Sequence, residues 1–477
     1  MYPTKAQAQT LLRWIGCQRF IYNAKVSEDR YFRTFARKSL QLTGEHSPVD
    51  QKYAQFIGEG TEWLREVPSH VLRNGSVGWM QAYGRYFKKL AARPKKQKKT
   101  GPQSVWLTSE LFSFVEKTDK ETGEISYSFN VGTKKFPVGI IEYKAHRSHS
   151  VPASVRIVVE SGRWYLSLSN DDGKNIPTDA ETAEWLSGFG LQELSDRAIG
   201  VDRGVAIPFA LSNGSTFGLS EVQIGRIKKK QVAAKRWQRK LSRRQKGSAN
   251  RRKAAKRIES LRHYEKCVRK DFAHQTSHRI VSDPKALLIV FEALGVERMT
   301  RRAKPKMDEN GKWVRNGAAA KSGLNKSILS SAWSITKECC VYKARKAGKL
   351  VVEVPAHHTS QACFKCGHTH PDNRLSQAEF VCQSCGHSEN ADLNAAKNIR
   401  QRGVELIASG AFSEKSKKRT MRMRKKDKKL GADCSDVMPV EVEVSRGTGN
   451  GCALWPEKQE GCAAMPAEAP TLTCVAG

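Results

Sequence analysis

The spacing of apolar and polar positions divides the first part of the chain into a helical region followed by a β-rich one. Within residues 1–100, apolar residues such as Leu11, Leu12 and Ile15 recur at helical spacing behind a capping-box sequence that starts at Thr4. Residues 101–175 instead hold short runs of β-forming residues separated by turn residues, with strands predicted at 104–107, 125–131, 139–143, 154–160 and 164–169. Several short strands at this spacing favour a small β-barrel or sandwich, and residues 176–195 are predicted to be a linker.

The second part of the chain alternates apolar runs with amphipathic ones, which predicts buried strands and helices. The apolar runs are 198–201, 206–211, 286–291 and 349–354. Residues 298–322 form a polar, basic insertion, and an amphipathic helix is predicted at 324–342, where Cys339 and Cys340 are expected to be buried. Together these elements predict an α+β protein with several domains.

Two of the apolar runs end in an acid, and a third acid opens a predicted helix. Asp202 follows the first strand, Glu292 ends the third, and Asp392 precedes a helical stretch at 393–400. A carboxylate among apolar strand residues is costly unless it is paired or bound to a metal. Acids on strand, hairpin, strand and helix in this order are typical of an RNase H-like nuclease fold. Three carboxylates around one cleft can hold two Mg²⁺ ions about 4 Å apart, so we predict that these acids are the catalytic residues and the magnesium ligands.

Four cysteines form two CxxC pairs just before the third acid. Cys363 and Cys366 are followed, after fifteen intervening residues, by Cys382 and Cys385, and a glycine follows each pair. This spacing predicts one structural Zn²⁺ held by four thiolates. Three histidines are alternative ligands, although four cysteines already complete a tetrahedron: His368, His370 and His387. The simplest alternative is a zinc ribbon that folds a loop and does nothing else.

The most basic stretch of the chain lies between the first two acids. From Arg226 to Lys270, 20 of 45 residues are Lys or Arg, and only Glu259 and Glu265 oppose them. Gly247 and Ser248 are predicted to divide this stretch into two helices. A solvated helix face normally mixes both signs of charge, so we expect contact with phosphates instead. The residues predicted to bind nucleic acid are Arg236, Arg239, Lys240, Arg243, Arg244, Arg251, Arg252, Lys256 and Arg257.

Composition restricts the class of function further. The chain has 477 residues, with 83 Lys and Arg against 47 Asp and Glu, which gives a formal net charge of +36. This charge argues against an enzyme that acts on small neutral or acidic molecules and indicates a polyanionic partner such as nucleic acid. Because the sequence contains no apolar run long enough for a membrane span and no signal peptide, we expect no membrane partner. The cysteines outside the two CxxC pairs show no disulfide framework, so we expect a reducing cytoplasm. The regular spacing of apolar residues is lost near the C-terminus, and residues 406–477 are predicted to be a disordered tail.

Four short motifs surround the predicted site residues. They are Gly200-Val-Asp202-Arg-Gly204, Val290-Phe-Glu292-Ala-Leu294, Thr359-Ser360-Gln361-x-Cys363 and Asn390-Ala-Asp392-Leu-Asn-Ala-Ala-Lys-Asn398. These motifs resemble the TnpB family of transposon-encoded, RNA-guided DNA endonucleases, which are related to the type V CRISPR effectors. The resemblance is close from about 196 to 402 and fair over the N-terminal half, and the three acids match the family's three acids one for one.

The resemblance implies an order of domains and a set of partners. It implies a helical recognition lobe at 1–100, a wedge β-barrel at 101–175, a linker at 176–195 and a RuvC-like nuclease domain at 196–358 and 390–405. A zinc ribbon at 359–389, inserted in that domain, would load the target nucleic acid. The implied partners are a guide RNA and double- and single-stranded target DNA, with a monomer as the expected oligomeric state. The implied location is the cytoplasm of a prokaryote, in association with the nucleoid.

Two features depart from the family pattern. Members usually carry about one more strand before the Tyr2-Pro3-Thr4 motif, whereas this chain starts at Met1. Arg203 stands where an apolar residue is common.

Four functions remain in competition at this point. The expected one is RNA-guided, Mg²⁺-dependent DNA cleavage by a transposon-encoded enzyme. A compact type V CRISPR effector of the same lineage is the first alternative, and a neighbouring repeat array would distinguish it. A non-cleaving RNA-guided repressor is the second, although its lineage typically loses one of the three acids that this chain retains. The third is a strand-transfer transposase with the same core fold, which would need no guide RNA.

Overall fold

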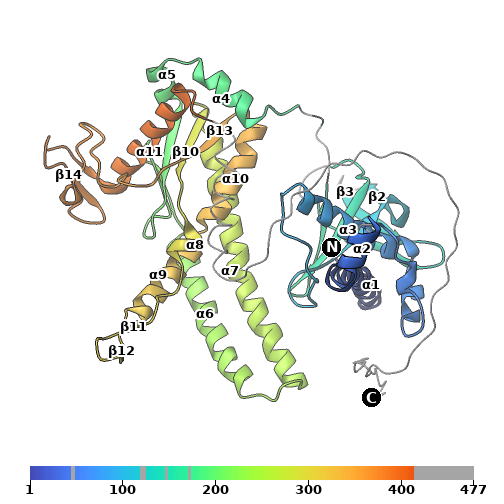
Figure 1. Cartoon of the computed structure of the whole chain (residues 1–477). Coiled ribbons are helices and arrows are strands. Elements are labelled where there is room, and N and C mark those ends of the chain that lie inside the picture. The colour runs from blue at the N-terminus through green and yellow to red at the C-terminus, as the bar shows by residue number, and fades with distance from the viewer. Residues whose placement is uncertain (45–48, 119–124, 146–148, 170–172, 174, 413–477) are drawn as a thin grey trace. The chain divides into compact units, whose positions relative to one another are not determined.

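The N-terminal part of the protein is helical, as the apolar spacing predicts, and it starts with three helices. The computed structural model describes residues 1–44, 49–118, 125–145, 149–169, 173 and 175–412 (Figure 1). The helices are α1 (Lys5–Tyr31), α2 (Arg37–Thr43) and α3 (Ser69–Phe87). A π-helical turn, Phe32–Ala36, joins the first two, and 3-10 turns at Ala54–Phe56 and Glu62–Glu66 precede the third. The predicted capping box is confirmed: the Thr4 hydroxyl accepts a hydrogen bond from the Gln7 amide, and the Gln7 side chain accepts one from the Thr4 amide.

Six antiparallel strands follow, one more than the sequence predicts. They are β1 (Gln103–Thr108), β2 (Phe112–Thr118), β3 (Ile125–Gly132), β4 (Pro137–Tyr143), β5 (Ser154–Glu160) and β6 (Arg163–Leu168). The strands form two three-stranded sheets, with the orders β1-β5-β6 and β2-β3-β4. The strand that the sequence analysis missed, β2, begins directly after the 3-10 turn Ser109–Leu111, which connects the two sheets.

The predicted β-barrel is wrong, because in the described part of the chain these strands close into no barrel. Each sheet keeps its own edges, and no strand of one is hydrogen-bonded to a strand of the other among the described residues. The sheets instead share an apolar core with α1 and α3, to which Trp14, Phe129 and Ile157 contribute fully buried side chains. Strand periodicity predicts which residues face this core, but the pairing of edges depends on contacts between distant segments.

The prediction of a linker at 176–195 is also wrong, because this stretch contains two short helices. They are α4 (Asp179–Ser187) and α5 (Leu191–Asp196). The helix α4 begins with a capping box formed by Thr178 and Glu181. The side chains of Leu186 and Leu194 are fully buried in a core that includes the strands described next. Both helices are too short to be stable alone, and the packing of their apolar side chains in this core stabilises them.

A five-stranded mixed sheet forms the centre of the second part, in the order β13-β10-β7-β8-β9. The strands are β7 (Ala198–Asp202), β8 (Phe209–Leu211), β9 (Thr216–Phe217), β10 (Leu288–Glu292) and β13 (Leu350–Val354). β7, β10 and β13 run parallel, whereas β8 and β9 continue the sheet as antiparallel strands. The apolar runs at 198–201, 286–291 and 349–354 are therefore confirmed as neighbouring buried strands.

Helices cover both faces of this sheet, which explains why its parallel strands are continuously apolar (Figure 1). Ile289 and Phe291 face a core with the helices α7 (Ala249–Val281) and α10 (Trp333–Lys346). Leu288 and Val290 face the opposite core, with α4, α5 and α11 (Ala391–Ala408).

The helix α11 lies so close to the sheet that two contact positions must be glycine. A Cβ atom on Gly200 of β7 would lie 2.0 Å from the carbonyl oxygen of Ala396. A Cβ atom on Gly403 would lie 2.2 Å from a methyl carbon of Val290 on β10. The glycine two residues before Asp202 thus lets the helix that carries Asp392 cross β7 in direct contact.

The basic stretch forms two long helices, α6 (Glu221–Ser242) and α7, as predicted. The break occurs at the predicted place, with Gly247 in the left-handed region (φ +86°) and Ser248 as the N-cap of α7. The insertion holds α8 (Val296–Met299) and a short hairpin of β11 (Lys306–Met307) and β12 (Trp313–Val314). The helix predicted at 324–342 is in fact two helices, α9 (Ala318–Ser330) and α10, because the backbone turns at Ala332 (φ +57°). Cys339 and Cys340 are buried in α10, as expected.

The segment with the four cysteines contains little regular structure. It holds a 3-10 turn at Pro371–Asn373 and the antiparallel strands β14 (Glu379–Val381) and β15 (Ser388–Asn390), which lead into α11. That helix extends to Ala408 and buries Ile407, so the first residues of the predicted tail belong to the fold. The rest of the predicted tail, 413–477, lies outside the described residues. Among the residues that are described, no helix combines the length and the apolar character that crossing a membrane requires.

Candidate active site and metal centre

The four predicted zinc ligands meet at one point. The sulfur atoms of Cys363, Cys366, Cys382 and Cys385 all lie within 4.8 Å of one another. The Sγ atoms of Cys363 and Cys385 are 3.7 Å apart, and those of Cys366 and Cys382 are 3.6 Å apart. A tetrahedron with Zn–S bonds of about 2.3 Å has edges of about 3.8 Å, so the thiols have the spacing of a four-cysteine zinc site.

The backbone of each CxxC pair forms the same tight turn. The amide of Gly367 donates to the carbonyl of Cys363 at 2.8 Å, and the amide of Gly386 donates to that of Cys382 at 3.0 Å. Both glycines adopt positive φ, +76° and +69°. Backbone amides of Cys385 and Ser384 lower the pKa of the Cys382 thiol to about 7, whereas burial raises the pKa of the Cys363 thiol in the same cluster.

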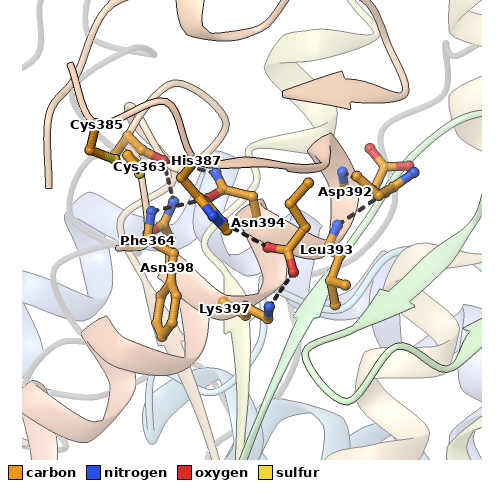
Figure 2. Close-up of polar contacts among 12 residues, drawn as sticks. Cys363, Phe364, Cys385, His387, Asp392, Leu393, Asn394, Lys397 and Asn398 are labelled. Atoms are coloured by element: carbon orange, nitrogen blue, oxygen red, sulfur yellow. Dashed lines mark hydrogen bonds and ion pairs between the residues drawn. The ribbon is translucent and has the colours of Figure 1, made fainter. Parts of the chain in front are cut away.

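The nearby histidines are not part of this cluster. In the part of the chain that is described, the group of donor atoms gathered at this point consists of cysteines alone. The His387 ring instead lies beside Glu389, with Nε2 3.6 Å from a carboxylate oxygen, and Glu389 also pairs with Lys397 (Figure 2).

The three predicted acids lie at the ends of elements that meet at one edge of the central sheet. Asp202 and Glu292 end the neighbouring parallel strands β7 and β10. Asp392 lies in the first turn of α11, the helix that crosses β7. The Asn390 side chain caps this helix by accepting hydrogen bonds from the amides of Asp392 and Leu393, at 3.0 and 3.2 Å. This cap accounts for the Asn390-Ala-Asp392 part of the sequence motif.

The pKa values indicate that the acids influence one another. Burial raises the pKa of Asp202 to about 7, and the charges of Glu292 and Asp392 contribute to the rise. Burial also raises the pKa of Glu292 and that of Asp392. The carboxylates are nevertheless less tightly grouped than the thiols: over the described ranges, the four cysteines are the only set of three or more possible metal-ligand atoms gathered so closely.

Three further residues contact these acids, and the sequence analysis did not assign them to the site. The Thr359 hydroxyl donates to a carboxylate oxygen of Glu292. A guanidinium nitrogen of Arg374 lies 3.4 Å from a carboxylate oxygen of Asp392, and its charge opposes the rise that burial causes in the pKa of that acid. Arg203 is buried, donates to the backbone carbonyl of Glu292, and lies 5.8 Å from the centre of the Phe291 ring.

Only one of these three carried a usable sequence signal. Arg203 was visible as a charge in an apolar context, and Thr359 lies within one of the motifs without any indication of its partner. Arg374 has no distinguishing pattern, because it lies between the two CxxC pairs among other polar residues.

The predicted nucleic-acid contacts fall into two groups. Seven of the nine basic residues are exposed on α6, on α7 or in the turn between them: Arg236, Arg239, Lys240, Arg243, Arg252, Lys256 and Arg257. The other two stabilise the turn itself. Arg251 donates to the carbonyls of Leu241 and Arg244 at 2.6 and 3.1 Å, and Arg244 donates to that of Asn250 at 2.5 Å.

A basic cleft between α6, α7 and α9 was not predicted. It has a volume of about 860 Å³. Its cationic lining residues are Lys230, Lys235, Arg262, Arg269, Arg302, Lys321 and Lys326. One acid, Glu265, also lines the cleft, and it is paired with Arg269 at 2.8 Å.

Three protein families match separate segments of this chain. A family described as a probable transposase matches residues 191–303, which include Asp202, Glu292 and both basic helices. A family described as the Cas12f1-like TNB domain matches residues 333–399, which include the four cysteines and Asp392. A helix-turn-helix domain family matches residues 1–30, in α1.

Two relatives match over nearly their whole lengths. "Putative RNA-guided DNA endonuclease InsQ" of Escherichia coli K12 is 29% identical over 416 residues, which cover 86% of this chain and 92% of that protein. A Streptomyces pristinaespiralis protein described in the same words, without the name InsQ, is 27% identical over 420 residues, covering 86% of this chain and 89% of its own.

Among solved structures, a Cas12f1–sgRNA–target DNA complex matches 84% of this chain and 96% of its own, with 17% identity and a TM-score of 0.30. The similarity rests on the sequence matches, and the matched segments include all three acids and all four cysteines. These matches confirm the resemblance to the TnpB family that the sequence motifs indicate.

Proposed function

We propose that this protein is an RNA-guided DNA endonuclease that hydrolyses phosphodiester bonds at a centre formed by Asp202, Glu292 and Asp392. The observation that carries the proposal is the shared environment of these acids: the pKa of Asp202 is raised to about 7 by burial and by the charges of the other two. The names of the two near-full-length relatives support the same activity.

Two Mg²⁺ ions are the proposed catalytic cofactors, with the three carboxylates as their protein ligands. Carboxylate oxygens are ligands that Mg²⁺ prefers, and bound cations would offset the repulsion that raises the pKa of Asp202. When bound, such ions activate a water molecule and stabilise the leaving oxygen. Carboxylates that surround two ions need not touch one another, so their looser grouping is compatible with this role.

Two arginine side chains beside the acids stabilise their charge and their position. The positive charge of Arg374 favours the ionised form of Asp392. The hydrogen bond from Arg203 to the carbonyl of Glu292 holds the end of β10, next to β7. Both contacts stabilise the arrangement in which the acids can accept a metal ion.

We assign one structural Zn²⁺ to the four cysteines, and we propose a zinc ribbon at 359–389 inserted between 196–358 and 390–405 of a RuvC-like, RNase H-like domain. This ribbon supplies Thr359 and Arg374, which touch two of the acids. Its proposed role is to load the target nucleic acid.

The guide RNA and the target DNA are the proposed partners of the basic surfaces. The exposed residues of α6 and α7 and the cleft that α9 completes offer cations on several helix faces, as contact with phosphates requires. We propose a recognition function for 1–100 and a wedge function for 101–175, without the closed barrel.

The experiment that tests this function is RNA-guided cleavage by single-acid variants. RNA that copurifies with the protein is sequenced, and a plasmid that matches its guide segment is offered with Mg²⁺. Replacing Asp202, Glu292 or Asp392 with alanine should abolish cleavage and leave RNA and target binding nearly unchanged. Asp196→Ala, which removes an exposed acid at the end of α5, is the matched control and should cleave normally. Cleavage at the unmutated rate by any one of the three variants would refute the proposal.

A compact type V effector is the alternative, and the match of residues 333–399 to the Cas12f1-like family supports it. The chemistry at the acids would be the same. The copurified RNA separates the two functions, because a guide with CRISPR repeat sequence would indicate an effector.

A further inference from the structure

Among the described residues, one side chain is hydrogen-bonded to the Glu292 carboxylate and can fix its orientation. Glu292 and Thr359 are both buried, with 6% and 2% of their surfaces exposed. In the described part of the chain, the Thr359 hydroxyl is the only side-chain group that hydrogen-bonds the Glu292 carboxylate. The bond reaches Oε1 and leaves Oε2 without a hydrogen-bond partner among the described residues, so one oxygen is held while the other can bind a metal ion.

The Thr359 hydroxyl has one proton and two neighbouring acceptors. The second is the backbone carbonyl of Ala356, at 3.1 Å. When Glu292 is ionised, as a metal ligand must be, its negative charge makes it the stronger acceptor, because hydrogen bonds to charged groups are about twice as strong as neutral ones. The hydroxyl therefore donates to Glu292 in the state that binds metal.

The backbone of Thr359 is itself held by the helix that carries Asp392. The Asn398 amide nitrogen on α11 donates to the carbonyls of Thr359 and Ala362, at 2.9 and 2.7 Å. Asn394, one turn earlier, donates to the carbonyl of Ala362 at 2.8 Å and accepts from the amide of Phe364 at 3.0 Å. Figure 2 shows both asparagines beside the turn that contains Cys363 and Phe364, on the same helix as Asp392.

These contacts join two of the acids by a short path. The path runs from Asp392 along α11 to Asn398, through one hydrogen bond to Thr359, and through a second to Glu292. Asn394 and Asn398 are 0% and 8% exposed, so the hydrogen bonds that they donate are shielded from water.

We propose that Thr359 is a positioning residue that orients Glu292 as a metal ligand, and that Asn398 fixes Thr359 in place. The inference rests on the proposed function, since it concerns the same metal centre. Partners that orient a ligand from outside the coordination sphere typically change metal affinity by about 10- to 100-fold when they are removed.

Metal binding to the full-length protein tests this role directly. Protein stripped of nucleic acid by nuclease and high salt is titrated with Mn²⁺, and free Mn²⁺ is measured by electron paramagnetic resonance. The signal from Asp202→Asn defines binding elsewhere on the chain and is subtracted. Thr359→Val, which has nearly the same shape but lacks the hydroxyl, should weaken the Asp202-dependent binding about tenfold.

Two further variants separate positioning from packing. Thr359→Ser keeps the hydroxyl and should bind Mn²⁺ within about twofold of the unmutated protein. Thr182→Val is the matched control: this threonine is 7% exposed, and its hydroxyl donates to the backbone carbonyl of Thr178, the N-cap of α4. Removing this hydroxyl should not change Mn²⁺ affinity. In cleavage assays, Thr359→Val should need more Mg²⁺ for half-maximal rate and show an unchanged KM for DNA.

The possible outcomes bear on the two proposals differently. If Thr359→Val binds Mn²⁺ as tightly as the unmutated protein, or if Thr359→Ser is as weak as Thr359→Val, the positioning role is overturned. If the unmutated protein shows no Asp202-dependent Mn²⁺ binding, the proposed metal centre fails and the positioning role fails with it. Should Thr359→Val lose zinc or unfold, Thr359→Ala, which places no methyl group against the carboxylate, is judged by the same criteria.

Discussion

Replacing Asp202 with asparagine should stabilise the magnesium-free protein, and by an amount that depends on pH. The pKa of Asp202 is raised from its usual 3.8 to about 7 by burial and by Glu292 and Asp392. The folded chain therefore holds this proton more tightly than the unfolded chain does. As a result, the contribution of Asp202 to the free energy of unfolding falls as the pH rises from about 4 to about 7, and this contribution is constant above that range.

The size of the effect follows from the difference between the two pKa values. At pH 8 the carboxyl is ionised in both states, and the rise of the pKa from 3.8 to about 7 corresponds to about 4 kcal/mol of destabilisation. At pH 5 the folded chain keeps the proton and the cost is about 2 kcal/mol. The asparagine side chain of the variant carries no charge at either pH, so the advantage of Asp202→Asn over the unmutated protein should grow by about 2 to 3 kcal/mol between pH 5 and pH 8.

Urea unfolding at pH 5 and pH 8, followed by tryptophan fluorescence, measures this difference. The buffers contain no added divalent cation, and chelators are avoided because they would also remove zinc from the four cysteines. Added Mg²⁺ should stabilise the unmutated protein at pH 8 and stabilise the variant much less. Asp196→Asn, at an exposed acid, is the control and should show no pH-dependent gain. The argument is refuted if the gain from Asp202→Asn is the same at both pH values.

Three other variants test the packing, the zinc site and the basic helices. Gly403→Ala would put a methyl group against Val290 and should lower the free energy of unfolding by about 2 kcal/mol; normal stability in urea would contradict the close contact of α11. Cys385→Ser should reduce the zinc content, measured by elemental analysis, from one ion per chain to none, and a retained ion would show that another ligand completes the site. Charge reversal of the exposed Arg243 and Arg252 should weaken binding to RNA of any sequence. The slope of the logarithm of the binding constant against the logarithm of the salt concentration should become shallower by about 2, because about two phosphate contacts are lost. An unchanged slope would mean that both side chains are only solvated on their helices.

Most of the successful predictions were based on sequence patterns that span only a few residues. Apolar runs of about five residues predict buried strands because both faces of a parallel sheet are covered, and β7, β10 and β13 are such strands. Gly247 and Ser248 predict the break between α6 and α7 because only local backbone geometry and capping are involved.

Predictions that required pairing between distant segments failed or were never made. The strands of 101–175 were expected to form a barrel, but which edges pair depends on how two sheets and two helices share a core. The residues 176–195 have an amphipathic pattern too short to distinguish from a linker until Leu186 and Leu194 are seen to be buried. The single helix expected at 324–342 failed at Ala332, whose left-handed conformation has no sequence signal.

At the candidate site, too, local features were predicted and contacts between distant residues were not. The kinds of groups present could be predicted from the sequence, since acids that end buried strands and two CxxC pairs are unusual enough to be recognised from spacing alone. The residues that surround these groups depend on the three-dimensional packing, because Thr359 is 67 residues from Glu292 along the chain and Arg374 is 18 from Asp392. A hydrogen bond between two buried side chains depends on the positions of both backbones, and no local periodicity encodes that distance.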